Sequence, residues 1–399
     1  MNRTERIILF LLASINFTHI LDFMIMMPLG NYLMQYFGIT TQQFSLIVSA
    51  YSYSAFTSGI LAAFVVDNFD RKKVLLFGYC GFIIGTICCG LAPDYKFLVA
   101  ARIMAGLFGG LIAAQVLSIV ADTFTYEKRG RAMGYLMSAF SIASVIGVPF
   151  SLYLSNIFSW HAPFILVGGL GIVIIPLVMR FLPSMTQHIN RTEERVKLGQ
   201  TIILALSRPA SLLALSLSAL MVLGHFIIIP FINPYMEFNV GFTKNQIPLI
   251  YIVGGVATLF SAPFFGKLSD RYGKLRVFIL CSLITLPLIY LITTMPDVRF
   301  YLVLIVTGFW FIFANGRAVA AQAMISNVVE SQYRGSFMSI NSSVQQLFIG
   351  SASFFAGLIV TNDATHRIHH YEWVGYLSVA ILASCMLVGR QLRNHTPDI

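Results

Sequence analysis

Long apolar segments limit what this chain can fold into more than any other feature of its sequence. A helix needs about 20 consecutive apolar residues to cross the hydrocarbon core of a bilayer. Twelve segments of that kind can be placed, at 6–34, 43–66, 74–92, 97–124, 131–156, 160–182, 209–235, 245–268, 274–294, 299–327, 337–361 and 372–392. A chain in which 57% of the residues are hydrophobic and only 11% are charged cannot form the surface of a water-soluble globule. We therefore predict a polytopic membrane protein.

The order of the segments predicts an all-α fold of twelve transmembrane helices in two six-helix bundles. The longest polar stretch separates the sixth segment from the seventh. We expect an N-terminal bundle at 1–182, a cytoplasmic linker at 183–208 and a C-terminal bundle at 209–399. An outer-membrane barrel would instead show alternating strands of about 10 residues, and no such alternation dominates here.

The net charge of +10 raises the question of a nucleic-acid partner, and the placement of the basic residues argues against one. If both termini are cytoplasmic, most of the 26 Lys and Arg residues fall in the termini, the cytoplasmic loops and the linker. This is the asymmetry that orients membrane proteins. The basic residues therefore indicate topology in a lipid bilayer, and we predict a multi-pass protein of the cell membrane, the inner membrane in a bacterium.

Two pairs of charged turns recur at an offset of about 200 residues, as two halves of matching topology would require. "VVDNFDRKK" (65–73) follows the second segment and "GKLSDRYGKLR" (266–276) follows the eighth. "YEKRGRAMG" (126–134) follows the fourth and "SQYRGSFMS" (331–339) follows the tenth. Chance similarity between basic cytoplasmic loops is the alternative explanation.

With these turns, the chain resembles twelve-helix transporters of the major facilitator superfamily, and among them the drug:proton antiporters. The turn at 266–276 is similar to the superfamily's Gly-x-x-x-Asp-Arg-x-Gly-Arg-Arg loop, whereas the first copy has Ala63 and Asp70 where glycines are expected. "LDFMIMMP", "ARIMAGLFGG" and "SWHAPF", with His161 in place of an arginine, are further similarities. The resemblance implies a monomeric transporter, not an enzyme, that moves a small molecule by alternating access and uses the proton gradient in place of a cofactor.

By the same resemblance, the charged turns form a conformational lock on the cytoplasmic face. The candidate residues are Asp67, Arg71, Lys72, Asp122, Arg129, Arg131, Gly266, Asp270 and Arg271. A carboxylate at a helix end accepts hydrogen bonds from a neighbouring helix N-terminus and pairs with basic side chains. Such a pair could hold one state of the transporter. The alternative is that these residues are interfacial anchors worth about 1 kcal/mol each.

Asp22 stands inside the first apolar segment, where a carboxylate costs roughly 2.5–3.5 kcal/mol unless it is protonated, paired or hydrated. Counting ~1.5 Å per residue places Arg102 of the fourth segment at a similar depth. A carboxyl group between burial and a guanidinium could bind and release a proton as its hydration changes. We predict Asp22, Arg102 and His19 as a proton-coupling site, with a purely structural ion pair as the alternative.

Arg317 is a second intramembrane charge, and its own half supplies no obvious acidic partner. An anionic substrate group, a helix carboxyl end or cavity water could be its counterpart. With His225, Tyr51, Phe23 and Trp310 it makes up the predicted substrate site, and this inventory favours an amphipathic organic substrate.

Three observations bear on other possible functions. "IGVPFS" carries Gly147 and Pro149 but only part of the antiporter signature, so an importer of a sugar, a siderophore or a peptide is the alternative. The loop "HRIHH" lacks the neighbouring carboxylate or cysteine ligands of a metal site, so we predict no metal. A membrane enzyme or receptor would need a catalytic constellation or a signalling domain, and neither is present in the sequence.

Overall fold

The structure, a computed structural model, describes residues 3–65, 69–124, 126–186, 208–329, 334–363 and 365–395. Within these ranges twelve helices are long and apolar enough to cross a membrane. The predicted all-α, twelve-helix fold is therefore confirmed.

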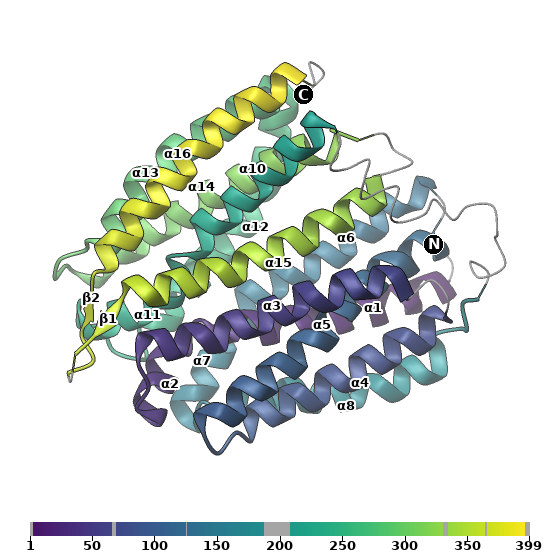
Figure 1. The fold of residues 1–399 in the computed structure, drawn as a ribbon, viewed down its shortest axis with the longest axis horizontal. Helices are drawn as coiled ribbons and strands as arrows, with labels where there is room; N and C mark the ends of the chain where they lie inside the picture. Colours follow the sequence, from purple (N-terminus) through teal and green to yellow (C-terminus); the bar gives the residue numbers. More distant parts are fainter. Residues whose placement is uncertain are drawn as a thin grey trace. The chain divides into compact units, whose positions relative to one another are not determined.

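The helices of the first half run in the order of the predicted segments (Figure 1). They are α1 (Arg3–Met26), α2 (Gly30–Phe37), α3 (Thr41–Val65), α4 (Arg71–Gly90), α5 (Tyr95–Thr123), α6 (Tyr126–Ile142), the π-helical turn η2 (Ala143–Gly147), α7 (Val148–Ile157) and α8 (Ala162–Phe181). Together, α6, η2 and α7 correspond to the fifth predicted segment.

The second half adds further helices and one short hairpin. They are α10 (Pro209–Phe226), α11 (Ile229–Phe238), α12 (Ile247–Tyr272), α13 (Lys274–Thr293), α14 (Phe300–Ser326), α15 (Arg334–Ile359), β1 (Thr361–Asn362), β2 (Ile368–His369) and α16 (Tyr371–His395). The two strands pair antiparallel, with Thr361 opposite His369.

Proline and glycine explain where the helices differ from the predicted segments. The first segment was expected to run to 34, but α1 ends at Met26, because Pro28 lacks the backbone N–H that a continuing helix needs. The seventh segment is likewise divided, and α11 restarts with Pro230 in its first turn. Gly273 joins α12 to α13 at a φ of 94°, a conformation that favours glycine.

The chain forms two compact units, which we describe separately. Unit 1 consists of Met1–Met26 and Ala50–Val196, and unit 2 of Met27–Ser49 and Lys197–Ile399. In unit 1, α4 packs along α5 and α8, and α1 packs on α6 and α8. In unit 2, α14 packs on α12 and α13, and α16 lies along α10 and α13 (Figure 1). The helix of the fourth predicted segment, α5, thus packs in unit 1, and that of the tenth, α14, packs in unit 2.

The segment Met27–Ser49 belongs to unit 2, although it comes early in the chain. Asn31 of α2 donates a hydrogen bond to the Glu237 carboxylate of α11. Thr41 Oγ1 donates to the Val360 carbonyl over 2.6 Å. These contacts fix α2 and the start of α3 on unit 2, whereas the division at the linker 183–208 stays a prediction.

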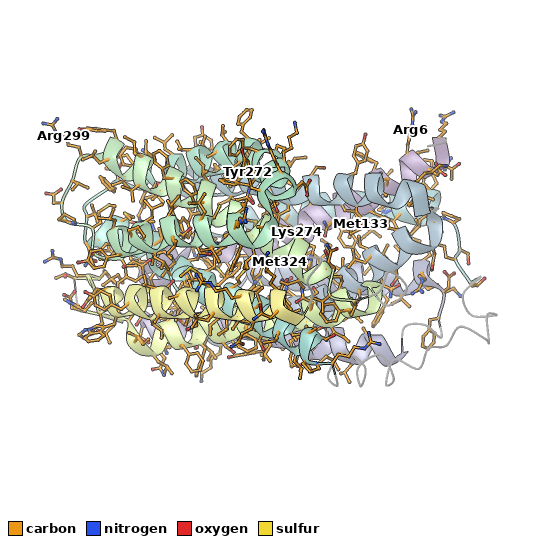
Figure 2. The ribbon with its side chains drawn as sticks, turned by 90° about the horizontal axis from the view of Figure 1, so that it is seen from above. Arg6, Met133, Tyr272, Lys274, Arg299 and Met324 are labelled. Carbon is orange, nitrogen blue, oxygen red and sulfur yellow. The ribbon has the colours of Figure 1, made fainter. Side chains whose placement is uncertain are left out.

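Charged side chains gather at helix ends. Figure 2 shows Arg6 in the second turn of α1 and Arg299 directly before α14, each extending away from the ribbon, and both are exposed. Such placement lets an apolar helix lie in hydrocarbon while its charges reach water or lipid headgroups. Buried charges inside the helices are therefore the exception that calls for an explanation.

Candidate functional site

A buried ion pair joins three helices in the core of unit 1. Arg102 Nη1 of α5 donates a hydrogen bond to Asp22 Oδ2 of α1 over 2.8 Å, and the two side chains are 1% and 0% exposed. Thr86 Oγ1 of α4 donates to the other carboxylate oxygen over 3.1 Å. The sequence left open whether Asp22 meets Arg102, and the structure brings them into direct contact.

Tyr51 connects this pair to the histidine. The Arg102 guanidinium carbon lies 4.3 Å from the centroid of the Tyr51 ring, a cation–π contact. The Tyr51 hydroxyl is 3.0 Å from His19 Nε2. His19 therefore reaches the carboxylate of Asp22 through Tyr51 and Arg102, in a chain of contacts. Phe23 packs beside Tyr51, with ring centroids 5.7 Å apart.

Glycines of α5 place Tyr51 against this helix. A Cβ at Gly106 would lie 2.3 Å from the Tyr51 carbonyl oxygen, and one at Gly109 would lie 2.6 Å from its hydroxyl. Only glycine allows α3 to approach α5 this closely. These residues thus act in packing, and that packing brings the phenol within reach of His19.

Two hydroxyl groups near the pair carried no recognisable sequence signal. Thr86 stands in the apolar run "IGTICCG" of α4, and Tyr79 lies about two turns before it. The Tyr79 hydroxyl is 3.0 Å from Thr18 Oγ1 of α1. Single hydroxyl groups are common in transmembrane helices, so their partners become evident only when the helices are packed.

Three predicted substrate residues lie together in unit 2. The rings of His225 in α10 and Trp310 in α14 are stacked, with centroids 5.1 Å apart and an interplanar angle of 20°. Arg317 follows Trp310 by about two helical turns and is 1% exposed. The predicted substrate residues therefore fall into two groups, since Tyr51 and Phe23 belong to unit 1.

Within unit 1, two of the predicted lock residues form an ion pair. Arg71 Nε at the start of α4 lies 2.5 Å from Asp122 Oδ2 near the end of α5. Lys72 Nζ donates to the Met179 carbonyl of α8 over 2.8 Å. Asp67 lies outside the described residues, as do the side chains of Arg129 and Arg131.

Asp70, which replaces a motif glycine, is the N-cap of α4. Its carboxylate accepts hydrogen bonds from the Lys72 amide (3.0 Å), the Met185 amide (2.9 Å) and the Ser184 hydroxyl (2.5 Å). Burial raises the pKa of Asp70, but the hydrogen bonds from Ser184, Met185 and Lys72, with the charge of Lys73, outweigh it and lower the pKa overall. An aspartate directly before a helix is a recognisable cap signal that our motif comparison did not use.

The second charged turn looks different. Gly266 lies within α12 with open space at its Cα, so no close approach requires a glycine there. Asp270 and Arg271 are exposed at the end of the same helix. The Arg271 guanidinium lies over the ring of Tyr272, 5.4 Å from its centroid. The lock role of these three residues stays a prediction.

A partly apolar groove of about 900 Å³ opens between α1, α6 and α8 in unit 1. Leu9, Phe17, Ile142 and Leu177 are among its lining residues, and Arg6 lies at one end. The Asp22–Arg102 pair does not line it. Within the described residues, no group of three or more His, Cys, Asp or Glu side chains is arranged to hold a metal ion.

The comparisons with known proteins agree with this architecture. The family model of the Major Facilitator Superfamily matches residues 12–230 and 214–397. Among bacterial relatives, the uncharacterized MFS-type transporter YbcL of Bacillus subtilis is 24% identical over 91% of this chain and 90% of its own. Multidrug resistance protein 2 of the same organism is 25% identical over 87% of this chain and 86% of its own.

A solved structure shows the same fold. The inward-facing, unoccupied structure of a bacterial homolog to the human lysosomal transporter Spinster has a TM-score of 0.79 and 15% sequence identity, and it covers 99% of both chains. At this identity the likeness establishes the fold alone. The matched family model, which spans nearly the whole chain, shows that this multi-pass membrane protein belongs to the Major Facilitator Superfamily of small-molecule transporters.

Proposed function

We propose that this transporter, acting as a monomer, exports an amphipathic small organic molecule in exchange for protons by alternating access. The observation that carries the proposal is the fully buried pair of Asp22 and Arg102. Ionisable residues inside a membrane are costly and commonly mark ion or substrate pathways. One relative is named Multidrug resistance protein 2, which adds support for export of organic compounds.

Proton binding to Asp22 would change the whole contact chain. The ionised carboxylate accepts two hydrogen bonds and balances the charge of Arg102. Protonation removes that balance and leaves a cationic guanidinium in a buried site, which favours a different packing or hydration. Because Arg102 also lies on Tyr51, and Tyr51 contacts His19, the change can reach α3 and the adjoining face of α1.

The π-helical turn η2 gives unit 1 a place where this change can act. It lies directly before Val148 and Pro149, and a Cβ at Gly147 would lie 2.6 Å from Leu21 Cδ1. Leu21 is the neighbour of Asp22 in α1. Since π-turns are frequent at functional sites and mark bends, we propose that α1 and the segment around η2 rearrange together.

The pair of Arg71 and Asp122 serves as a conformational lock in this proposal. It ties the start of α4 to the end of α5, the two helices that also supply Thr86 and Arg102. Its atoms lie at the helix ends, where hydration changes readily between states. A lock of modest strength suits a transporter, because the pair must break in each cycle.

Import by proton symport is the second candidate. The incomplete antiporter signature "IGVPFS" favours it, since that segment is expected to set the exchange direction in the resembled antiporters. The same Asp22–Arg102 pair would then couple proton entry to uptake. Only the direction of movement separates the two candidates, so the decisive experiment measures direction.

The test uses everted membrane vesicles with an acidified interior and a pH-sensitive dye. Lipophilic cations, amphipathic carboxylates, antibiotics, sugars and siderophores are added in turn. We expect at least one amphipathic compound to release protons from wild-type vesicles and not from vesicles with Asp22→Asn. Asp297→Asn, at an exposed loop position, is the matched control and should behave as wild type.

Proton release by both wild type and Asp22→Asn would show that the coupling site lies elsewhere. If no compound releases protons, while a sugar, siderophore or peptide accumulates in right-side-out vesicles together with protons, the protein is an importer. The first result would contradict the role of Asp22 in coupling, and the second would contradict the direction of transport.

A further inference from the structure

Arg317 carries a buried charge that nothing in the described part of the chain neutralises. Its side chain is 1% exposed, and neither Nε nor Nη1 has a hydrogen-bond partner there. A buried guanidinium without a partner is strongly destabilising, because it loses its hydration without gaining an ion pair. Such a group calls for a reason beyond packing.

Two further polar groups beside Arg317 are also unsatisfied. Trp310 Nε1 and His225 Nδ1 are buried and have no hydrogen-bond partner in the described residues. The indole and the guanidinium can only donate, and the imidazole nitrogen can donate when protonated. Three side chains from α10 and α14 thus present unused hydrogen-bonding nitrogens. The chemistry that satisfies them is an acceptor with negative charge.

The helix geometry brings these groups to one side of α14. Arg317 follows Trp310 by about two turns, so both lie on a similar face, and helical side chains lean towards the N-terminus. The Cα–Cβ bonds of the two residues therefore project from a similar face of α14. Arg317 is near enough to His225 for their charges to interact.

Among the described residues, the remaining neighbours of Arg317 add no negative charge. The charged or titratable groups that interact with Arg317 are the thiols of Cys281 in α13 and Cys385 in α16, together with His225. Cysteines buried in apolar surroundings are inert and uncharged at neutral pH. The site has one uncompensated positive charge, which matches a ligand group with one negative charge better than a dianion.

We propose that Arg317, Trp310 and His225 form a subsite in unit 2 that binds a single carboxylate-type anionic group, with the apolar body of the ligand against the aromatic rings. This subsite rests on the proposed transport function, and it narrows the substrate class to amphipathic monoanions. An ordinary structural arginine would be paired, as Arg102 is in the same chain.

Trp310 provides a local reporter for the test. The other tryptophans, Trp160 and Trp373, are replaced by phenylalanine in the purified full-length protein, and fluorescence is followed in lipid nanodiscs without a proton gradient. The probes are benzoate, its neutral counterpart benzamide and its cationic counterpart benzylamine, with sodium chloride as a separate arm. We expect benzoate to change Trp310 fluorescence saturably, at least tenfold more tightly than either counterpart.

Three variants test the charge. Arg317→Met should weaken benzoate binding at least tenfold, Arg317→Lys should retain part of it, and the exposed Arg299→Met should leave it unchanged. Thermal unfolding gives a second measurement that does not depend on fluorescence. Benzoate should raise the midpoint of the wild type and not that of Arg317→Met, whereas without benzoate Arg317→Met should unfold at the same temperature or higher.

Several results would overturn the subsite. Equal binding of benzamide or benzylamine would show that the site does not require negative charge. Unchanged benzoate binding in Arg317→Met would show that Arg317 is not part of the binding site. Displacement of benzoate by millimolar chloride, with the same fluorescence change, would make this an inorganic anion site only. A much lower unfolding midpoint for Arg317→Met without benzoate would make Arg317 a structural residue.

The binding test is independent of proton coupling. If benzoate binds with the expected charge preference but no compound releases protons from the vesicles, the subsite stands and the exchange mechanism fails. If only cationic or neutral compounds release protons, and Arg317→Met exchanges them as wild type does, the exchange stands and the subsite fails.

Discussion

The two buried arginines of this chain lie in matching helices and in opposite electrostatic surroundings. Arg102 in α5 and Arg317 in α14, the helices of the fourth and tenth predicted segments, are each 1% exposed. Arg102 pairs with Asp22, whereas two nitrogens of Arg317 have no partner in the described residues. In the first helix of each half, His19 contacts a tyrosine and His225 stacks on a tryptophan.

This difference separates two kinds of polar site inside a membrane. A paired charge is satisfied at rest and responds when a proton removes its partner. An unpaired charge is costly at rest and becomes satisfied when an anion arrives. In our two proposals, the buried arginine therefore serves coupling in one half and ligand binding in the other, because the placement of one carboxylate differs.

The largest difference between the two arginines is expected when each guanidinium is removed in turn. Arg102→Met leaves the Asp22 carboxylate buried and unpaired, and we expect a loss of about 3–5 kcal/mol in the free energy of unfolding. Arg317→Met removes an uncompensated charge and should be neutral or stabilising. Both are measured by thermal and denaturant unfolding in the same detergent. Equal losses would mean that Arg317 has a partner after all.

A double substitution checks the cause of the first effect. Asp22→Asn combined with Arg102→Met removes both charges, so its loss of stability should be smaller than the sum of the two single losses, by a coupling energy of about 1–3 kcal/mol. Additive losses from the two single substitutions would show that the pair contributes little beyond packing.

A methyl group can test the link between the pair and the histidine. In Gly109→Ala the new Cβ would lie 2.6 Å from the Tyr51 hydroxyl and 3.0 Å from His19 Nε2. We expect a loss of about 1–3 kcal/mol from overpacking and impaired proton exchange. Gly134→Ala is the control, because it meets open space. A normal exchange rate in Gly109→Ala would show that the His19–Tyr51 contact is not required.

The smallest effect concerns the anchor of α4, the helix that supplies Thr86 to the paired site. Ser184→Ala removes one hydrogen bond to Asp70 and should cost about 0.5–1.5 kcal/mol at neutral pH. The folded-state pKa of Asp70 is lowered, so the contribution is complete above the unfolded pKa of about 3.9 and is lost as the pH falls through the folded value. Unfolding of wild type and variant at several pH values measures this.

The direction in which the stability difference changes with pH is the check on the Ser184→Ala experiment. The difference between wild type and Ser184→Ala should shrink as the pH is lowered, because a protonated Asp70 no longer attracts the hydroxyl as strongly. A difference that grows towards low pH would contradict the assignment.

Apolar length and charge placement predicted the helices, because each helix satisfies its own backbone in lipid whatever its neighbours are. Local rules could also have predicted the break at Pro28 and the cap at Asp70. The residues that meet across helices were harder to predict. Asp22 and Arg102 were proposed as partners from their similar depth and from the family resemblance. Thr86 had no signal, since its role depends on the rotation of α4.

Apolar length, charge placement and motifs were enough to predict the membrane-spanning fold, the family and the presence of two costly arginines in apolar helices. The packing of the helices then showed that one arginine meets a carboxylate, whereas Nε and Nη1 of the other have no hydrogen-bond partner among the described residues. The physical reason is that hydrophobicity and helix propensity act within a segment, whereas the pairing of a buried charge depends on which faces of different helices meet. Among the described residues, Arg102 forms an ion pair with Asp22, and Arg317 forms no ion pair.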